Sequence, residues 1–176
     1  MSDKPIWLVE AEKYLGIKEI AGSKNNATVV DFWKKIHLNS ISNDEVPWCA
    51  AFVGAVLENV GYKSTRSGLA KSYLNFGEKL NGPALGSIVV FTRKGGGHVG
   101  FVVGKDKDGN IFVLGGNQSD AVNIKKFTTQ NVVGYRWPDA KIAVSATPVL
   151  TSSADFEVKV TWHNNGMVEK VPDQEM

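Results

Sequence analysis

The sequence predicts an α+β domain in which helices near the N-terminus pack on an antiparallel sheet. Apolar residues first recur every three or four positions, as on one face of a helix, up to the segment LAKSYLNFG. From Pro83 onward the chain consists of short runs rich in valine, isoleucine and phenylalanine, separated by turn residues. Helices first and strands afterwards are typical of the α+β class. The 43% hydrophobic content is enough to fill the core of one such domain.

Four helices are predicted. The first starts around Pro5 and ends at Gly16, and the second follows the polar loop AGSKNN. The third starts near Pro47 and ends at Gly61, and a short fourth lies in LAKSYLNFG. The residues predicted to face the core are Trp7, Ala11, Tyr14 and Leu15 in the first helix, Val29, Phe32, Trp33 and Ile36 in the second, and Phe52, Val53, Val56, Leu57 and Val60 in the third.

Five strands are predicted, in GSIVVFT, HVGFVVG, NIFVLGG, AVNIKKF and VVGYRW, and they indicate a sheet of five to six antiparallel strands. We expect residues 1–139 to form the domain and residues 140–176 to form a C-terminal appendage. The appendage contains one candidate hairpin, FEVKVTW and GMVEKV around HNN, followed by a polar tail.

Composition and charge argue against several classes of function. Twenty basic and eighteen acidic residues alternate along the chain, which argues against a nucleic-acid partner. No apolar stretch has the length of a membrane span, and the N-terminus lacks the pattern of a secretory signal, so we expect synthesis in the cytoplasm without membrane insertion. One cysteine cannot form an intrachain disulfide, and three scattered histidines are poorly spaced for zinc. We therefore expect no metal and no cofactor.

The single cysteine, Cys49, lies in PWCAAFV, in the first turn of the third predicted helix. Unpaired backbone N–H groups and the positive end of the helix dipole favour a thiolate at this position. Phe52 and Val53 follow at helical spacing, so the sulfur points to the side that the helix buries. A small buried hydrophobe is the alternative interpretation of a lone cysteine. A nucleophilic cysteine also requires a base.

His98 is the candidate base. It opens the apolar strand of GGGHVGFVVG, after three glycines that allow another segment to approach closely. Alternation along the strand puts His98, Gly100 and Val102 on one face and their neighbours on the other. A structural histidine is the alternative, because histidine is intermediate in burial.

Asn117 is the candidate that orients the imidazole. A four-residue loop over residues 106–109 brings Asn117 opposite His98 in the neighbouring strand, whereas a three-residue loop brings Gln118 there instead. An amide that holds one ring nitrogen lets the other face the sulfur. Gln118 and Asp120 are therefore reserves for this role. An asparagine with only a structural role at a strand end is the alternative.

PWCAAFV, followed later in the chain by GHVGFVVG, resembles the NlpC-type cell-wall peptidases and their relatives, the cysteine, histidine-dependent amidohydrolase/peptidase (CHAP) domains, over residues 5–138. The resemblance implies a papain-like α+β fold with the nucleophile at a helix N-terminus against an antiparallel sheet. It implies cleavage of amide bonds in peptidoglycan by Cys49 and His98, with Asn117 as the third polar residue.

The sequence also departs from the family's pattern. CHAP members often have an acid before the asparagine, where this chain has Gly115 and Gly116. NlpC-type members often have serine after the cysteine, where this chain has Ala50.

The resulting hypothesis is a peptidoglycan hydrolase that forms a thioester at Cys49 after His98 has taken the thiol proton. The backbone N–H of Cys49 is the expected oxyanion donor, and Trp48 and Gly97 are expected in the substrate cleft. We expect a monomer that acts in the periplasm or cell wall as a phage endolysin or a secreted antibacterial effector, with an immunity protein or delivery machinery as further partners. A catalytically degenerate wall-binding module and an acyltransferase that uses the same thioester are the alternatives.

Overall fold

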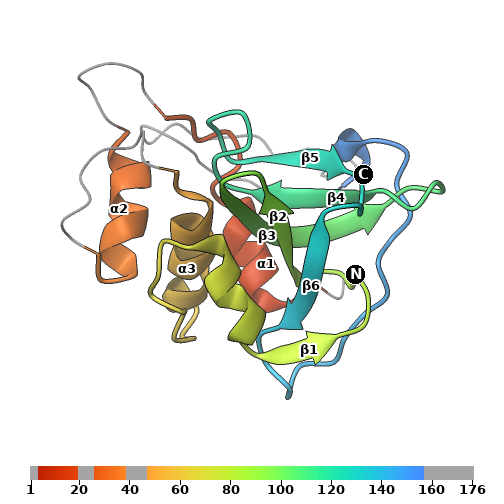
Figure 1. The fold of residues 1–176 in the computed structure, drawn as a ribbon, viewed down its shortest axis with the longest axis horizontal. Helices are drawn as coiled ribbons and strands as arrows, with labels where there is room; N and C mark the ends of the chain where they lie inside the picture. The colour runs from red at the N-terminus through yellow and green to blue at the C-terminus, as the bar shows by residue number, and fades with distance from the viewer. Residues whose placement is uncertain (1–3, 20–25, 39–46, 157–176) are drawn as a thin grey trace.

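The computed structural model describes residues 4–19, 26–38 and 47–156. In this part of the chain, three α-helices pack against one face of a six-stranded antiparallel sheet (Figure 1). The predicted α+β class is confirmed. None of the helices among the described residues is long and apolar enough to cross a membrane.

The helices lie where the apolar spacing predicts them. The side-chain oxygen of Asn26 begins the second helix by accepting hydrogen bonds from the backbone N–H groups of Thr28 (2.8 Å) and Val29 (3.3 Å). Gly61 follows the third helix with a φ of +96°, a left-handed conformation that suits glycine and ends a helix. The predicted fourth helix is a 3-10 helix. The elements are α1 (Ile6–Glu12), α2 (Ala27–Lys35), α3 (Cys49–Asn59) and η1 (Ala70–Asn75).

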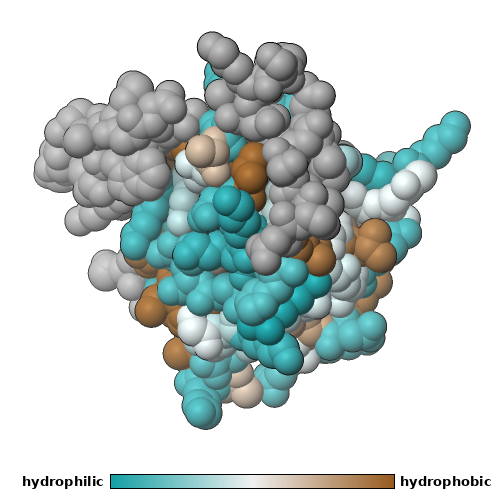
Figure 2. Space-filling model, turned by 90° about the vertical axis from the view of Figure 1, so that its left-hand side faces the viewer, coloured by the Kyte–Doolittle hydropathy of each residue, from teal (hydrophilic) through white to brown (hydrophobic). Residues whose placement is uncertain are grey.

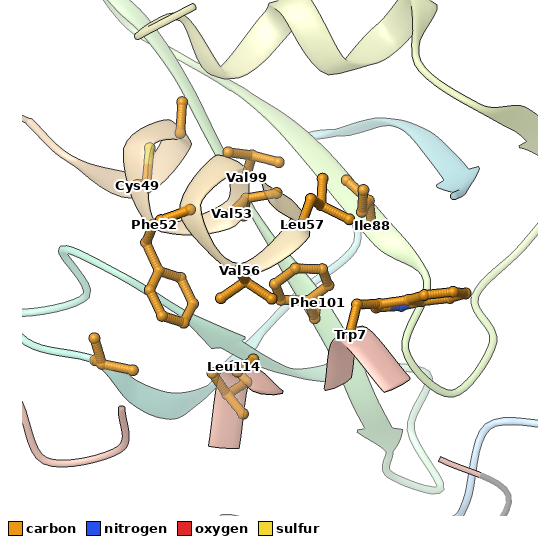
Figure 3. Packing of buried hydrophobic residues seen from close by; sticks show 14 of the residues in the cluster. Trp7, Cys49, Phe52, Val53, Val56, Leu57, Ile88, Val99, Phe101 and Leu114 are labelled. Atoms are coloured by element: carbon orange, nitrogen blue, oxygen red, sulfur yellow. The ribbon is translucent and has the colours of Figure 1, made fainter. Parts of the chain in front are cut away.

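Helix α3 lies at the centre of the domain. It contacts α1, α2 and β3, and its residues 49–57 are all buried. A helix that is apolar around its whole circumference is typical of such a position. Figure 3 shows Val53 of α3 near Val99 of the sheet and Val56 near Phe101, with Cys49 at the start of the helix. The helix therefore fixes the position of Cys49 against the sheet.

The strands lie in the order β1-β6-β2-β3-β4-β5, with antiparallel neighbours. Five of them coincide with predicted strands. The sixth, β1, has only three residues and lacks the apolar alternation that predicts a strand. The strands are β1 (Glu78–Leu80), β2 (Ile88–Arg93), β3 (Gly96–Lys105), β4 (Ile111–Gly115), β5 (Asn123–Phe127) and β6 (Val132–Trp137).

The two faces of the sheet have different surroundings. Val99, Phe101 and Val103 of β3 face the core beneath the helices. Val102 faces the other way and belongs to a smaller outer cluster, which consists of Val89, Phe91, Val102, Ile111 and Val113. His98 is four residues before Val102, so its side chain starts from the outer face, as the alternation predicts.

The β3–β4 hairpin determines where β4 ends. Phe101 pairs with Leu114 and Val102 with Val113, in the register that a four-residue loop predicts. A bulge then shifts the pairs near the turn, where Lys105 faces Ile111. At the other end, the ladder has no pair beyond Phe101 toward the start of β3, because β4 stops at residue 115.

Residues 140–156, the described part of the predicted appendage, lie against the sheet (Figure 1). The backbone N–H of Lys105 donates to Pro148 O (2.9 Å), and that of Leu150 donates to Lys105 O (2.8 Å). Leu150 and Phe156 belong to the main core. Gly104 leaves the space that Leu150 fills, since a Cβ there would collide with this side chain. The predicted hairpin and tail fall on residues 157–176, outside the described residues.

Candidate active site

A cleft of about 650 Å³ lies beside the N-terminal end of α3. Its lining includes the apolar side chains of Trp33, Leu38 and Leu69, together with the β2–β3 turn over residues 93–97. Cys49, Gly97 and Asn117, three residues that the sequence predicts for the site, also line it.

Cys49 is the first residue of α3 and is only 7% exposed. Its sulfur accepts a hydrogen bond from the backbone N–H of Val99. N–H groups of successive strand residues point to opposite sides, and Val102 donates to Ser87 on the β2 side (2.8 Å). The N–H of Val99 therefore points toward the β4 side, where β4 has already ended. The open edge of β3 thus leaves a donor for the sulfur.

His98 is almost fully buried, at 1% exposed. Its ring packs against Phe91 and Phe127, with centroid distances of 5.8 and 5.6 Å. Its Nε2 lies 3.0 Å from Oε1 of Gln118. The imidazole is therefore held by two aromatic rings and one amide.

The amide of Gln118 fixes the tautomer of His98. Its Nε2 donates to Val113 O (3.1 Å), Asn123 O (2.9 Å) and Asn123 Oδ1 (2.9 Å). Three oxygen atoms around one end of the amide identify that end as the NH2 group, so the other end, facing His98, is the carbonyl oxygen. A carbonyl only accepts, and His98 Nε2 must carry the proton. In the neutral ring, Nδ1 then keeps the lone pair that a base needs.

The structure corrects the predicted partner of His98, which is Gln118 and not Asn117. The predicted pairing extends β4 to residue 117, but the strand ends two residues earlier. Asn117, Ser119 and Asp120 then adopt positive φ angles of 59°, 56° and 63°, so the chain turns out of the ladder. Asn117 is thereby placed in the cleft lining, while Gln118 folds back toward the imidazole.

Gly115 and Gly116, the departures from the family pattern, have a packing reason. A Cβ on Gly115 would collide with the amide of Gln118. A Cβ on Gly116 would come within 2.7 Å of Phe52 Cβ and 2.8 Å of the Trp48 ring. The two glycines therefore let the end of β4 lie against both the imidazole's partner and the first turn of α3.

Trp48, predicted for the substrate cleft, is instead completely buried and does not line the cleft. Its Nε1 donates to Glu19 Oε1 at 2.9 Å, and its ring packs near Phe32. The bulk of the indole serves the core beneath the cleft, and its single donor has a partner there. Gly97 does line the cleft, as predicted.

Burial shifts both titratable groups toward their neutral forms. Desolvation raises the pKa of the Cys49 thiol, and the Val99 N–H and the charge of Arg93 oppose this rise. Desolvation lowers the pKa of His98 to about 4; the hydrogen bond to Gln118 opposes this, whereas the charges of Arg93 and Lys125 add to it. At neutral pH the unoccupied site therefore holds a thiol and a neutral imidazole.

Cys49 and His98 approach each other at the start of β3. The sulfur bonds to the N–H of Val99, which is one peptide unit from His98. No hydrogen bond joins the sulfur to the ring of His98 among the contacts of these two described residues. Hydrogen bonds between catalytic groups are often long in free enzymes and shorten when substrate binds. Nδ1 is the ring nitrogen that remains for the thiol, since Gln118 occupies Nε2.

The described residues contain no group of three or more His, Cys, Asp or Glu side chains that could hold a metal ion. The chemistry available in the cleft is that of a thiol, an imidazole, amides and backbone N–H groups.

Residues 41–117 match the model of the CHAP domain family. The chain carries a CHAP domain. The matched range contains Cys49 and His98, and helices packed on a six-stranded antiparallel sheet agree with the papain-like fold of such domains. CHAP domains are in general hydrolases, amidases or peptidases, of peptidoglycan. A search of curated proteins found no match to the chain.

Proposed function

We propose that this CHAP domain cleaves an amide bond in the stem peptide or cross-bridge of peptidoglycan, with Cys49 as nucleophile, His98 as base and Gln118 as the residue that orients the base. The observation that carries the proposal is the hydrogen bond from His98 Nε2 to Gln118 Oε1 (3.0 Å). It reserves Nδ1 for proton transfer beside a cleft in which the only cysteine of the chain is exposed.

In the proposed reaction, Nδ1 of His98 takes the thiol proton of Cys49 as the sulfur attacks the amide carbonyl carbon. The tetrahedral intermediate collapses to a thioester, and the imidazolium gives its proton to the leaving amine. Water then attacks the thioester, with His98 again acting as base, and the carboxylic acid product and free thiol are restored. Gln118 accepts from Nε2–H throughout, so the ring keeps its orientation.

Two donors are assigned to the oxyanion. The backbone N–H of Cys49 is one of the unpaired groups of the first turn of α3 and lies beside the attacked carbonyl. Asn117 lines the same cleft, and its side-chain amide is our candidate for the second donor. The positive φ of Asn117 is consistent with such a role, because strained backbone often occurs where a side chain must be placed for function.

The substrate lies outside the cytoplasm, so the proposal also requires release by cell lysis or by secretion. An endolysin and a secreted antibacterial effector both meet this requirement. An immunity protein is then a proposed partner for the effector alone.

The acyltransferase alternative requires a long apolar groove for a fatty chain. Figure 2 shows the side of the molecule that carries α2, and the described residues there are mostly hydrophilic, with hydrophobic residues in small separate areas. This face therefore gives the acyltransferase no support.

The proposal is tested with Cys49→Ala and purified peptidoglycan. We expect the wild type to release new amino groups, and mass spectrometry of the fragments to identify the amide that is cut. We expect Cys49→Ala to release none, because no other residue of the chain offers a thiol. Unchanged circular dichroism and melting temperature serve as the control for folding. Amine release by Cys49→Ala, or wall binding by the wild type without any release, would contradict the proposal.

A further inference from the structure

The cleft carries positive charge that nothing in the described structure neutralises. Arg93 and Lys94 are its two charged lining residues, and no described lining residue is acidic. Both side chains are exposed, and neither takes part in an ion pair among the described residues, in contrast to Arg66, which bonds Glu58 at 2.9 Å. An unpaired guanidinium at a cleft is suited to a ligand carboxylate, which it can bind through two parallel hydrogen bonds.

Arg93 lies close to the reacting groups. It is the last residue of β2 and pairs with Gly96 at the start of β3, two residues before His98. Its charge acts on both the Cys49 thiol and the His98 imidazole, whereas that of Lys125 acts on His98 alone. A carboxylate bound by Arg93 therefore lies near the carbonyl that Cys49 attacks, and not in a distant subsite.

The rest of the cleft lining is apolar. Leu69 is 72% exposed, and Trp33 and Leu38 line the cleft with it. A bound aliphatic side chain would remove the exposed surface of Leu69 from water, which is favourable. The cleft thus combines an apolar part with a cationic part.

We propose that the cleft selects an anionic peptide, with a free carboxylate close to the scissile amide and a small aliphatic side chain beside it, and that Arg93 binds the carboxylate. This inference rests on the proposed function. It predicts that the same peptide with its carboxylate converted to an amide is a poor substrate.

The experiment compares a peptidoglycan stem peptide in its free-acid and amidated forms. For the wild type we expect kcat/KM to be about 10-fold to 100-fold higher for the acid, the effect of a hydrogen-bonded charge pair. Arg93→Ala should bring the ratio of the two kcat/KM values close to one. The ratio matters because loss of Arg93 also changes the thiol's electrostatic environment, and that effect is common to both peptides.

Lys107→Ala is the matched control. Lys107 is an exposed cation in the β3–β4 turn, at the opposite end of β3 from the cleft, so it should leave the wild-type ratio unchanged. Binding of the free acid to Cys49→Ala and to Cys49→Ala/Arg93→Ala, measured by calorimetry, provides a second readout without turnover. Equal kcat/KM values for both peptides in the wild type, or an unchanged ratio in Arg93→Ala, would overturn this inference and leave the hydrolase intact. If the wild type cleaves neither the peptides nor peptidoglycan, the proposed function fails as well.

Discussion

At the residue scale, the four hydrogen bonds of the Gln118 amide determine which nitrogen of His98 can act as a base. Its NH2 group is fixed by Val113 and Asn123, and Asn123 Nδ2 also donates to the Gln118 backbone oxygen at 2.8 Å. The carbonyl end therefore cannot flip, and the imidazole cannot exchange its tautomer without losing a buried hydrogen bond. Gln118 is thus a positioning residue that acts through His98.

Gln118→Glu tests this role through the pH profile. In the wild type, His98 with a pKa of about 4 remains an unprotonated base down to acidic pH, so kcat/KM should fall only near that value. A carboxylate next to Nε2–H stabilises the imidazolium and raises the pKa of His98. We expect the acid limb of kcat/KM to move to higher pH in Gln118→Glu. A profile identical to that of the wild type would argue against contact between the two side chains.

Gln118→Leu removes the acceptor and leaves the ring free to rotate or change tautomer. We expect kcat to fall about 100-fold or more, the scale of general-base catalysis. Gln130→Leu is the matched control, because Gln130 is exposed in the β5–β6 turn and should retain wild-type kcat. Nitrogen-15 shifts of the imidazole check the tautomer directly: Nε2–H in the wild type and a mixture in Gln118→Leu.

At the element scale, the site exists because β4 is shorter than β3. The missing pairs at the start of β3 leave the Val99 N–H for the sulfur, and the segment after β4 turns back with Gln118. The segment is held from outside by α1's continuation, since Glu19 N donates to Asp120 O (2.9 Å) and Val122 N to Ile17 O (2.8 Å). Strand length, loop conformation and helix position together bring the site residues into one region.

Gly116→Ala tests the contact between the end of β4 and α3. Gly116 has no positive φ, so alanine meets no backbone penalty, but its Cβ collides with Trp48 and Phe52. We expect the free energy of unfolding to drop by about 1–3 kcal/mol through overpacking, and activity to fall as the start of α3 shifts. Urea denaturation measures the first effect and amine release the second.

Gly82→Ala is the matched control for that substitution. Gly82 has no atom within 4 Å of its ideal Cβ position and no positive φ, so we expect a change within about 0.5 kcal/mol. Equal effects of the two substitutions would show that the glycine at 116 is not required by packing.

The elements that the sequence predicts well are those whose side chains reveal their surroundings. Apolar spacing predicts α2 and α3 and the five longer strands, and the position of Cys49 at a helix start follows from Pro47 and the pattern after it. Strand β1 is not predicted, because a three-residue polar edge strand has no such pattern. The choice between Asn117 and Gln118 depends on a strand end and on three left-handed residues, and alternation alone does not encode these.

At the scale of the whole molecule, His98 couples the site to the stability of the fold. Its ring is buried on the outer face of the sheet against Phe91 and Phe127, where an imidazolium is poorly solvated. The unfolded chain binds a proton at His98 near the ordinary pKa of 6.5, whereas the folded protein does so only near 4. Between these values the unfolded state binds more protons, so the free energy of unfolding should fall as the pH decreases.

The size of this decrease follows from the two values. The difference between 6.5 and about 4, at about 1.4 kcal/mol for each pH unit, corresponds to a loss of about 3 kcal/mol in the free energy of unfolding. Urea denaturation at several pH values between 7 and 4 measures it. Glu58, whose pKa is lowered from 4.5 to about 2 mainly by its hydrogen bond to Arg66, loses its contribution at lower pH, so the two groups act in largely separate intervals.

His98→Phe isolates the effect. Phenylalanine does not titrate and can pack against the same two aromatic rings, so the variant should lose most of the pH dependence between 6.5 and 4 while Gln118 loses its partner at every pH. The variant should be inactive on peptidoglycan, which separates the stability effect of the residue from its proposed role as a base. If wild type and variant show the same slope in that interval, other groups cause the pH dependence, and the imidazole is not held neutral by burial as the structure indicates.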